Sequence, residues 1–488
     1  MREEILSAVQ RRNMFLAPDA YRLVEENNEP MAFINSILNA MKDNQIFITK
    51  QDVLDFMCGD KGTMSEEKYI KPVVKRCSDI HVVDNSDITG KSTCTGVMKD
   101  FSKYFQDRYR TLKRIIESNK RFGQSIPLAK ALTYDREVHV VGIIYSKTNY
   151  DNKSIGLKIE DDQGTICNAY IPADCPAAKD IFVEDQVIGI IGVPRRNSKG
   201  KNDRQPVASI TVREIINPDV PEMNKWIPSD STSTVAFLSD VHIGSTTFLE
   251  KSWKKMIRWM KDNSEGMDLN YIVFPGDVVD GIGIFPDQEK ELNIADIYKQ
   301  YETLAEYLKD IPDHIKMVVH PGNHDAVRPA EPQPALNKIF TGTFDSNVIL
   351  SGNPVYVEAE GRKILTYHGR SIDDWVSNVQ QLTYNDPIAV MKQMMTMRHL
   401  APLYGQKTAL APEEKDYMVI NTVPDIFVSG HVHGAGYLNY RGVRMINAST
   451  WQDQTDYQKN HNFNPEPAIM PVVHLGNGTV KMMNFRNA

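Results

Sequence analysis

Five short polar clusters carry the side chains of this chain that could perform chemistry, and each follows a hydrophobic run. The clusters are Asp240-Val241-His242, Gly276-Asp277-Val278-Val279-Asp280, Gly322-Asn323-His324-Asp325, His368 and Gly430-His431-Val432-His433. Polar residues that follow the strands of an α/β domain lie on loops at one edge of the sheet, where such domains place their sites. One Asp or His after a strand is more often a capped turn than a metal ligand, but five such clusters favour a common site.

The donor atoms in these clusters indicate a metal centre. They are oxygens and nitrogens, and no thiolate is among them because all five cysteines lie before residue 176. Carboxylate, amide and imidazole ligands suit manganese, iron, zinc or magnesium. Two such ions about 4 Å apart need a shared ligand and several further donors to offset their charge. The clusters supply enough donors for such a pair.

The segments around these clusters predict a layered α/β domain at residues 231–488. Hydrophobic runs at 234–238 and 271–274 have the composition of buried strands. Amphipathic helices are expected at 249–260, between these two runs, and at 297–308, because their apolar residues recur at helical spacing. Alternation of strands with helices is the signature of such a domain.

Upstream of this domain, the pattern predicts a small closed barrel at residues 121–220. Five runs of β-branched residues, separated by turns, have the composition of short strands and favour an oligonucleotide-binding (OB) type of barrel over a sandwich. The expected strands are 138–145, 155–160, 167–171, 187–193 and 208–216. The chain would begin with a small helical module at 1–57, followed by a linker and a basic helix at 58–120.

Two basic segments are candidates for nucleic-acid contact. The helix expected at 101–120 carries six Lys and Arg residues, and a solvated face is the favoured interpretation. The loop at 195–204 carries five, and it could equally follow a phosphate backbone or only increase solubility. The string Gly90-Lys91-Ser92-Thr93 resembles the end of a phosphate-binding Walker loop, but no apolar strand precedes it, so nucleotide binding is not expected there.

The bulk composition limits the class of protein. A length of 488 residues predicts two to four domains. The formal charge of −7 excludes a surface built throughout to neutralise phosphates, so any nucleic-acid contact must be local. The odd number of widely spaced cysteines gives no disulfide framework. With no long apolar segment, we expect a soluble intracellular protein, cytoplasmic and associated with the nucleoid.

The order of the five clusters resembles that of the calcineurin-like metallophosphoesterases, which include the Mre11-type nucleases, over about residues 232–480. Four longer strings resemble the small subunits of archaeal family D DNA polymerases: PGNHDAVRPAEPQPAL, TYHGRSIDD, MRHLAPLYG and ASTWQDQTDYQK. The first 57 residues carry little of this likeness. The resemblance implies an α/β/β/α sandwich for residues 231–488.

The resemblance also implies roles for single residues. Seven side chains would hold two metals, in two sets that share Asp277 as a bridge: Asp240, His242, Asp277 and His433, and Asp277, Asn323, His368 and His431. His324 would be catalytic, donating a proton to the leaving 3′ oxygen or stabilising charge on the phosphorane. Asp280 would orient this loop histidine. For Asp325, a structural role in capping the turn is favoured.

The function that the resemblance implies is 3′-to-5′ exonuclease activity, of the proofreading type, in a DNA polymerase complex. The substrate would be a single-stranded or frayed 3′ end of DNA, the metals two divalent ions, manganese by family likeness, and the partner a large catalytic subunit. A phosphomonoesterase or cyclic phosphodiesterase is the alternative enzyme. The alternative outside enzymology is a catalytically silent scaffold subunit, which the complete set of ligands disfavours.

Overall fold

The computed structural model describes residues 5, 7–9, 15–25, 30–40, 47–48, 53, 80–196, 208–263, 267–460 and 463–486. The chain forms two compact units, Met1–Lys75 and Arg76–Ala488. In the first unit, helices α2 (Pro18–Glu25) and α3 (Pro30–Ala40) accompany the short parallel strands β1 (Phe15–Leu16) and β2 (Phe47–Ile48). Ile34 and Ile37 of α3 are fully buried in a small core of this unit. Most of the expected linker, up to residue 79, lies outside the described residues.

The second unit contains a closed five-stranded barrel, as the sequence predicts. Its order is β4-β5-β6-β8-β7, and only the β6–β8 pair is parallel. Alternate residues of β5 point inward, so Ile155, Leu157 and Ile159 are buried in the barrel core. The strands are β4 (Val138–Asn149), β5 (Ile155–Glu160), β6 (Ile166–Ile171), β7 (Val187–Arg196) and β8 (Ala208–Ile216), with the short helices α6 (Leu128–Ala131) and η1 (Pro176–Lys179) beside them.

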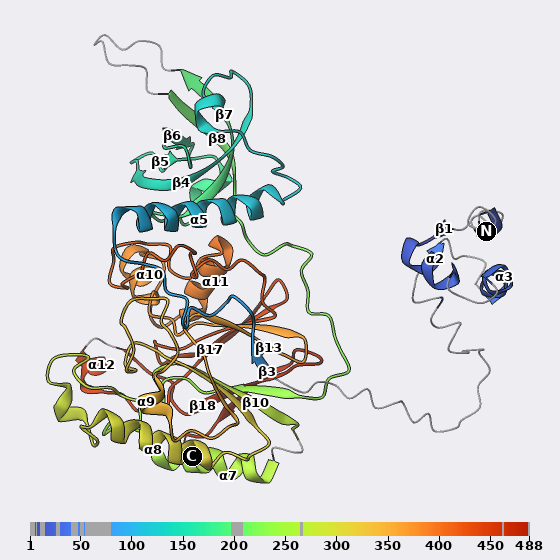
Figure 1. Ribbon diagram of the computed structural model, residues 1–488. Coiled ribbons are helices and arrows are strands. Elements are labelled where there is room, and N and C mark those ends of the chain that lie inside the picture. Colours follow the sequence, from blue (N-terminus) through green and yellow to red (C-terminus); the bar gives the residue numbers. More distant parts are fainter. Residues whose placement is uncertain are drawn as a thin grey trace. The chain divides into compact units, whose positions relative to one another are not determined.

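Helix α5 (Met98–Glu117) lies between the barrel and the α/β domain (Figure 1). Leu112 and Ile116 pack against barrel residues, and the Tyr109 hydroxyl donates to the Val141 carbonyl at 3.1 Å. The expected solvated basic face is wrong at Arg108, whose side chain is 0% exposed and whose Nε donates to Asp416 Oδ2 at 2.8 Å. The reason is tertiary, since its partner lies 308 residues further along the chain.

The α/β domain contains two six-stranded sheets. The first has the order β12-β11-β10-β9-β18-β19, in which β9 to β12 are parallel. The second has the order β16-β17-β15-β14-β13-β3, with β14, β15 and β17 parallel. A hydrophobic core forms between them, in which Phe237 and Val273 of the first sheet meet Ile364 and Val428 of the second.

The strands of the first sheet are β9 (Thr234–Phe237), β10 (Leu269–Pro275), β11 (Lys316–His320), β12 (Val348–Leu350), β18 (Ile469–His474) and β19 (Val480–Asn484). Those of the second are β3 (Ile80–Val82), β13 (Val355–Ala359), β14 (Arg362–Thr366), β15 (Ile426–Ser429), β16 (Ala435–Tyr440) and β17 (Val443–Ala448). Helices cover the outer side of each sheet and close two further cores.

The helices of the domain follow the amphipathic pattern of the sequence. On the first sheet, Trp253 and Met256 of α7 and Tyr301 and Leu304 of α8 are fully buried. On the second sheet, α10 and α11 bury Trp375 and the methionines of residues 391–397. The elements are α7 (Glu250–Asn263), η2 (Gln288–Glu291), α8 (Ile297–Lys309), α9 (Lys338–Thr341), α10 (Ile372–Asn378), α11 (Pro387–Met397) and α12 (Asp456–Asn460).

Part of the expected linker contributes to this domain. Ile80–Val82 pairs antiparallel with β13 at the edge of the second sheet. Further along, Ser92 Oγ and Thr93 N each donate to the Glu413 carboxylate at 2.6 Å. The string that resembles a Walker loop therefore binds a carboxylate of its own chain, which excludes a phosphate from the same donors.

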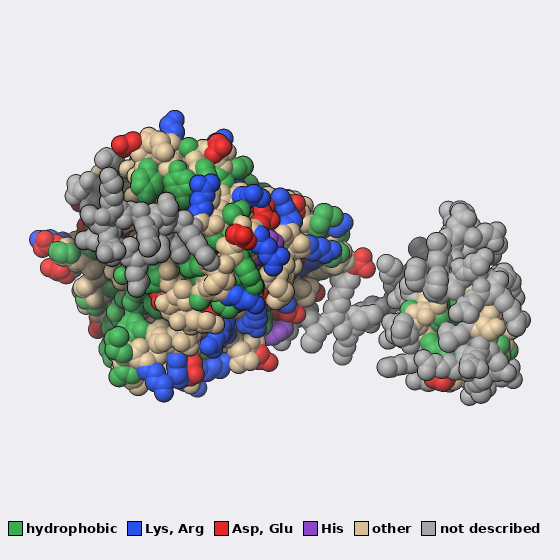
Figure 2. All heavy atoms as spheres, turned by 90° about the horizontal axis from the view of Figure 1, so that it is seen from above, with side chains coloured by type: hydrophobic (Ala, Val, Ile, Leu, Met, Phe, Trp, Pro, Cys, Tyr) green, Lys and Arg blue, Asp and Glu red, His purple; other side chains and the backbone are tan. Residues whose placement is uncertain are grey.

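The described surface is of mixed charge, as the formal charge of −7 leads us to expect. Figure 2 shows Lys and Arg side chains interspersed with acidic and hydrophobic ones on the face that it presents. Of the basic loop at 195–204, only the exposed Arg195 side chain belongs to the described residues. Within the part of the chain that the structure describes, no helix combines the length and apolarity needed to cross a membrane.

Candidate metal centre

The five polar clusters meet because each follows a strand that ends at the same edge of its sheet. Strands β9, β10 and β11 run parallel and are followed by Asp240, Asp277 and Asn323. In the second sheet, β14 and β15 run parallel and are followed by His368 and by the His431-Val432-His433 loop. Parallel strands bring their carboxyl ends to one edge, so loops distant in sequence face one another.

The seven expected metal ligands form two adjacent groups. In the first, one donor atom each of Asp240, His242 and His433 lies within 4.8 Å of the others, and the two imidazole Nε2 atoms are 3.1 Å apart. The second group is defined in the same way by Asp277, His368 and His431. It is joined by Asn323, whose Oδ1 lies 3.0 Å from His368 Nε2, while Asp277 Oδ2 lies 3.2 Å from the same nitrogen.

The electrostatics of the two groups suit cations. Burial alone would lower the pKa of His242 and His368, but Asp280 raises that of His242 to about 9, and Asp277 raises that of His368 to about 10. Burial would also raise the pKa of Asp277, yet the facing His368 holds it well below its usual range. The His242 and His368 imidazoles thus hold protons that a divalent ion would displace, because metal ligands must be deprotonated.

Backbone strain is concentrated at the same residues. Five of the seven expected ligands have positive φ angles, a left-handed conformation that costs non-glycine residues about 1–3 kcal/mol each. The angles are 53° for Asp240, 52° for His242, 50° for Asp277, 71° for His431 and 56° for His433. Strain of this size persists where the surrounding structure enforces it, and it is typical of functional sites.

His324 and Asp280 lie beside the first group, but their contact differs from the expected one. The His324 ring packs edge-on against His242, and its Nδ1 lies 2.8 Å from the backbone carbonyl oxygen of Asp280. The Asp280 carboxylate instead contacts His242 Nδ1 at 2.9 Å and accepts from Gln288 and Gln452 at 3.2 Å each. The carboxylate therefore orients an expected metal ligand, and only the carbonyl reaches the loop histidine.

The chain at Gly281 explains this arrangement. Gly281 has a φ angle of 71°, and a Cβ atom there would collide with the His324 carbonyl oxygen. The two loops therefore approach through their backbones.

Asp325, the last residue of the third cluster, is buried and accepts from the backbone nitrogens of Gly322 at 2.8 Å and of Val278 and Val279 at 3.3 Å. These contacts are those of a structural residue.

The Asp280 contact predicts an effect on metal affinity. Asp280→Asn keeps an oxygen near His242 but removes the charge that holds this imidazole in place. Outer partners of metal ligands contribute about 10–100-fold to affinity or activity, so we expect Mn²⁺ to bind weaker by that factor in calorimetric titrations. Asp287→Asn, an exposed residue of the same loop, is the matched control. Equal affinity of both variants and the unsubstituted chain would contradict the assignment.

Two outer contacts were not predicted from the sequence. His431 Nε2 lies 3.3 Å from Asp373 Oδ2, and Gln458 Nε2 lies 2.8 Å from His433 Nδ1. Asp373 belongs to the string TYHGRSIDD, which could have suggested it. Gln458 has no such signal, because it is a single polar residue of the short helix α12.

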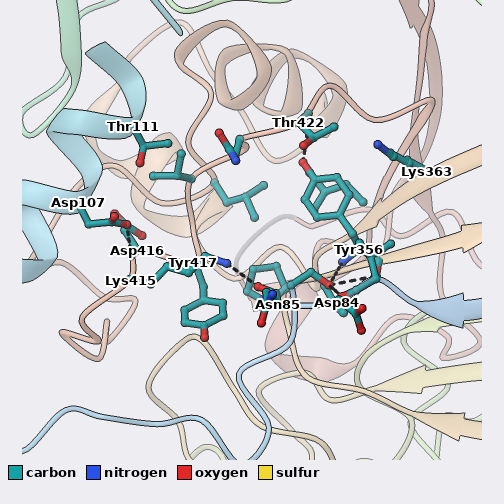
Figure 3. A pocket seen from close by; sticks show the side chains of 18 of the residues that line it. Asp84, Asn85, Asp107, Thr111, Tyr356, Lys363, Lys415, Asp416, Tyr417 and Thr422 are labelled. Carbon is teal, nitrogen blue, oxygen red and sulfur yellow. Dashed lines mark hydrogen bonds between the residues drawn. The ribbon is translucent and has the colours of Figure 1, made fainter. Parts of the chain in front are cut away.

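Five of the seven metal-ligand candidates line a cleft of about 440 Å³, namely His242, Asp277, Asn323, His431 and His433. A second cavity of about 350 Å³ lies beside α5, and Figure 3 shows Asp107, Asp416 and Lys415 on its wall. Two of its charged groups, Asp416 and Lys415, already have partners in the chain. Asp416 contacts His399 Nε2 at 2.9 Å as well as Arg108, while Lys415 Nζ donates to the Asn85 carbonyl. The first cleft is therefore the candidate for chemistry.

Comparison with known proteins places this chain among subunits of DNA polymerases. The B-subunit family of DNA polymerases alpha and epsilon matches residues 235–434. The DNA polymerase II small subunit of Archaeoglobus fulgidus is 42% identical over 86% of this chain and 83% of its own length. That of Methanothermobacter thermautotrophicus is 34% identical over 99% of both chains. Among solved structures, an archaeal phosphodiesterase covers 51% of this chain and 98% of its own, with 12% identity and a TM-score of 0.28, too low to carry an argument.

Proposed function

This chain belongs to the DNA polymerase II small subunits of archaea, and from that membership we propose that it supplies the polymerase with a 3′-to-5′ exonuclease. The observation that carries the proposal is the convergence of Asp240, His242 and His433 beside Asp277, His368 and His431. The seven ligands include no thiolate and combine carboxylate, amide and imidazole donors, a set that fits two divalent ions such as manganese, magnesium, iron or zinc.

Asp277 and His324 would have different roles in the hydrolysis. Asp277 would bridge two divalent ions held by the two ligand groups, and such a pair supplies an activated water and offsets charge on the phosphodiester. His324 is not an expected ligand, and its Nδ1 is engaged by the Asp280 carbonyl, which leaves Nε2 to donate a proton to the leaving 3′ oxygen.

The domain organisation that accompanies this function has four parts. We assign residues 1–57 to a helical module, 58–120 to a linker with the basic helix, 121–220 to an OB-type domain and 231–488 to a calcineurin-like metallophosphoesterase domain. The partner is a large catalytic subunit, because the relatives are named small subunits of a polymerase. DNA with a single-stranded or frayed 3′ end is the substrate.

Removal of metal gives the direct test. The full chain, alone and with its large subunit, is incubated with 3′-labelled single-stranded DNA. We expect Mn²⁺-dependent release of mononucleotides, complete loss after chelation with EDTA, and recovery when Mn²⁺ is restored in excess. Degradation that survives chelation would contradict the metal centre. Hydrolysis of a small chromogenic phosphoester without any degradation of DNA would instead favour the phosphomonoesterase or cyclic phosphodiesterase.

A further inference from the structure

One wall of the cleft carries basic and aromatic side chains that no expected role uses. Arg370, Lys407, Tyr384 and Phe463 line the same cleft as His324 and five of the seven metal-ligand candidates, His431 among them. The two sets of side chains differ in charge. The carboxylates among the metal-ligand candidates repel a phosphate, whereas the guanidinium and ammonium groups of the wall attract one. A wall of this composition next to a metal centre fits a nucleotide unit of the substrate.

The two basic residues are positioned by the same short helix that contacts a metal-ligand candidate. Arg370 precedes α10, whose Asp373 carboxylate contacts His431. The next residue, Asp374, accepts from the backbone nitrogen of Lys407 at 2.8 Å. Within the described residues, neither the Arg370 guanidinium nor the Lys407 ammonium has a hydrogen bond or ion pair with a protein group, so both can bind a ligand.

The aromatic residues form a pair fixed to the same groups. The rings of Tyr384 and Phe463 meet edge to face, with 4.5 Å between their centroids and 85° between their planes. Burial raises the pKa of Asp373, but His431 and a hydrogen bond from Tyr384 lower it overall. Phe463 N donates to the carbonyl of Gln458, the residue that contacts His433. The ring pair is therefore connected to His431 through Asp373 and to His433 through Gln458.

We propose that this wall binds the 3′-terminal nucleotide units of single-stranded DNA, an inference that rests on the proposed exonuclease function. Arg370 and Lys407 bind the phosphate next to the scissile one, and the Tyr384–Phe463 pair stacks on a base. Charge-assisted hydrogen bonds and base stacking both strengthen binding of an oligonucleotide without reading its sequence. A small phosphoester has no second phosphate, so it gains nothing from Arg370 and Lys407.

The test compares two substrates of the same centre, with Mn²⁺ present throughout. One is 3′-labelled single-stranded DNA, and the other is bis(p-nitrophenyl) phosphate, a diester without a second phosphate. For Arg370→Ala, Lys407→Ala and Phe463→Ala, we expect kcat/KM on DNA to fall about 10-fold or more, since a charged hydrogen bond or a stacked base contributes at least that factor. Hydrolysis of the small diester should change by less than about twofold in Arg370→Ala and Lys407→Ala, because this diester has no second phosphate and the metal ligands are untouched.

Salt dependence separates phosphate binding from a structural effect. Loss of one phosphate contact reduces the slope of log affinity against log salt by about one, so Arg370→Ala and Lys407→Ala should lower it and Phe463→Ala should not. Phe463→Tyr, which keeps the ring, should recover DNA degradation. Lys254→Ala, an exposed lysine of α7 outside the cleft, is the matched control.

The outcomes distinguish this inference from the function on which it rests. If the unsubstituted chain, alone and with its large subunit, hydrolyses the diester but never DNA, the exonuclease function fails. If it degrades DNA and the three variants match it on both substrates, the nucleotide-binding wall is refuted and the function stands. If the variants lose both substrates equally with unchanged melting temperatures, these residues support the metal centre and the inference is again refuted.

Discussion

Asp277→Ala should reduce metal-dependent hydrolysis of DNA by more than about 100-fold. Outer partners of metal ligands already contribute about 10–100-fold, and a ligand shared by two ions contributes to both. The Asp277 carboxylate also makes two contacts within the chain. Its Oδ2 lies 3.2 Å from His368 Nε2, and its Oδ1 accepts a hydrogen bond from the His324 backbone nitrogen at 2.8 Å. Its removal thus affects both ion sites and the position of the catalytic histidine. Rates are measured on 3′-labelled single-stranded DNA across a range of Mn²⁺ concentrations.

The left-handed backbone at Asp277 requires a second variant. Alanine is strained at a φ angle of 50°, whereas asparagine tolerates this conformation and keeps the shape of the side chain. Asp277→Asn should therefore lose activity to a similar extent while its melting temperature stays close to that of the unsubstituted chain. Asp310→Ala, on the exposed end of α8, is the control for loss of an aspartate. Full activity of a folded Asp277→Asn would end the two-metal proposal.

The parts of the fold that could be predicted from the sequence are those with a local signal. Hydrophobic runs followed by Asp, Asn or His predict strands that end in polar loops, and the parallel order of β9, β10 and β11 then brings Asp240, Asp277 and Asn323 together. Nothing local shows how the first sheet faces the second. Only the family resemblance placed His242 with His433, and the 3.1 Å between their Nε2 atoms comes from the structure.

Features that depend on distant partners could not be predicted in this way. Ile80–Val82 has too few residues to show a periodic pattern, and it becomes a strand only because β13 offers an edge. The sequence predicts a contact between Asp280 and His324, but spacing along the sequence cannot tell whether the carboxylate or the backbone carbonyl makes it. A basic helix likewise has the same pattern whether its face meets solvent or another domain, as Arg108 shows.

Arg108→Ala should strongly destabilise the second unit, although Arg108 lies outside the metal centre. The Arg108 guanidinium donates to Asp416 at 2.8 Å, to the Pro402 carbonyl at 2.7 Å and to the Asp185 carbonyl at 3.3 Å, so it joins α5 to both the barrel and the α/β domain. Removing one partner of a buried ion pair leaves an uncompensated charge and costs about 3–5 kcal/mol. Urea unfolding of the full chain, followed by tryptophan fluorescence, measures the loss.

The same helix provides the matched control for Arg108. Lys103 forms an ion pair with Glu414 at 3.1 Å, but the two side chains are 41% and 63% exposed. Exposed pairs contribute about 0–1 kcal/mol, so Lys103→Ala should change the free energy of unfolding by no more than that. Equal losses in the two variants would show that the buried pair has no special role.

The loss in Arg108→Ala should also depend on pH through His399. Burial lowers the pKa of His399 to about 4, and the positive charge of Arg108 contributes to this shift. Without Arg108, the pKa of His399 rises because its Nε2 still faces Asp416 at 2.9 Å. A protonated His399 then compensates the Asp416 charge at low pH, and this compensation disappears as the pH rises through the new pKa. The deficit in unfolding free energy should therefore be smaller at pH 5 than at pH 8, and a deficit that grows on acidification would contradict this network.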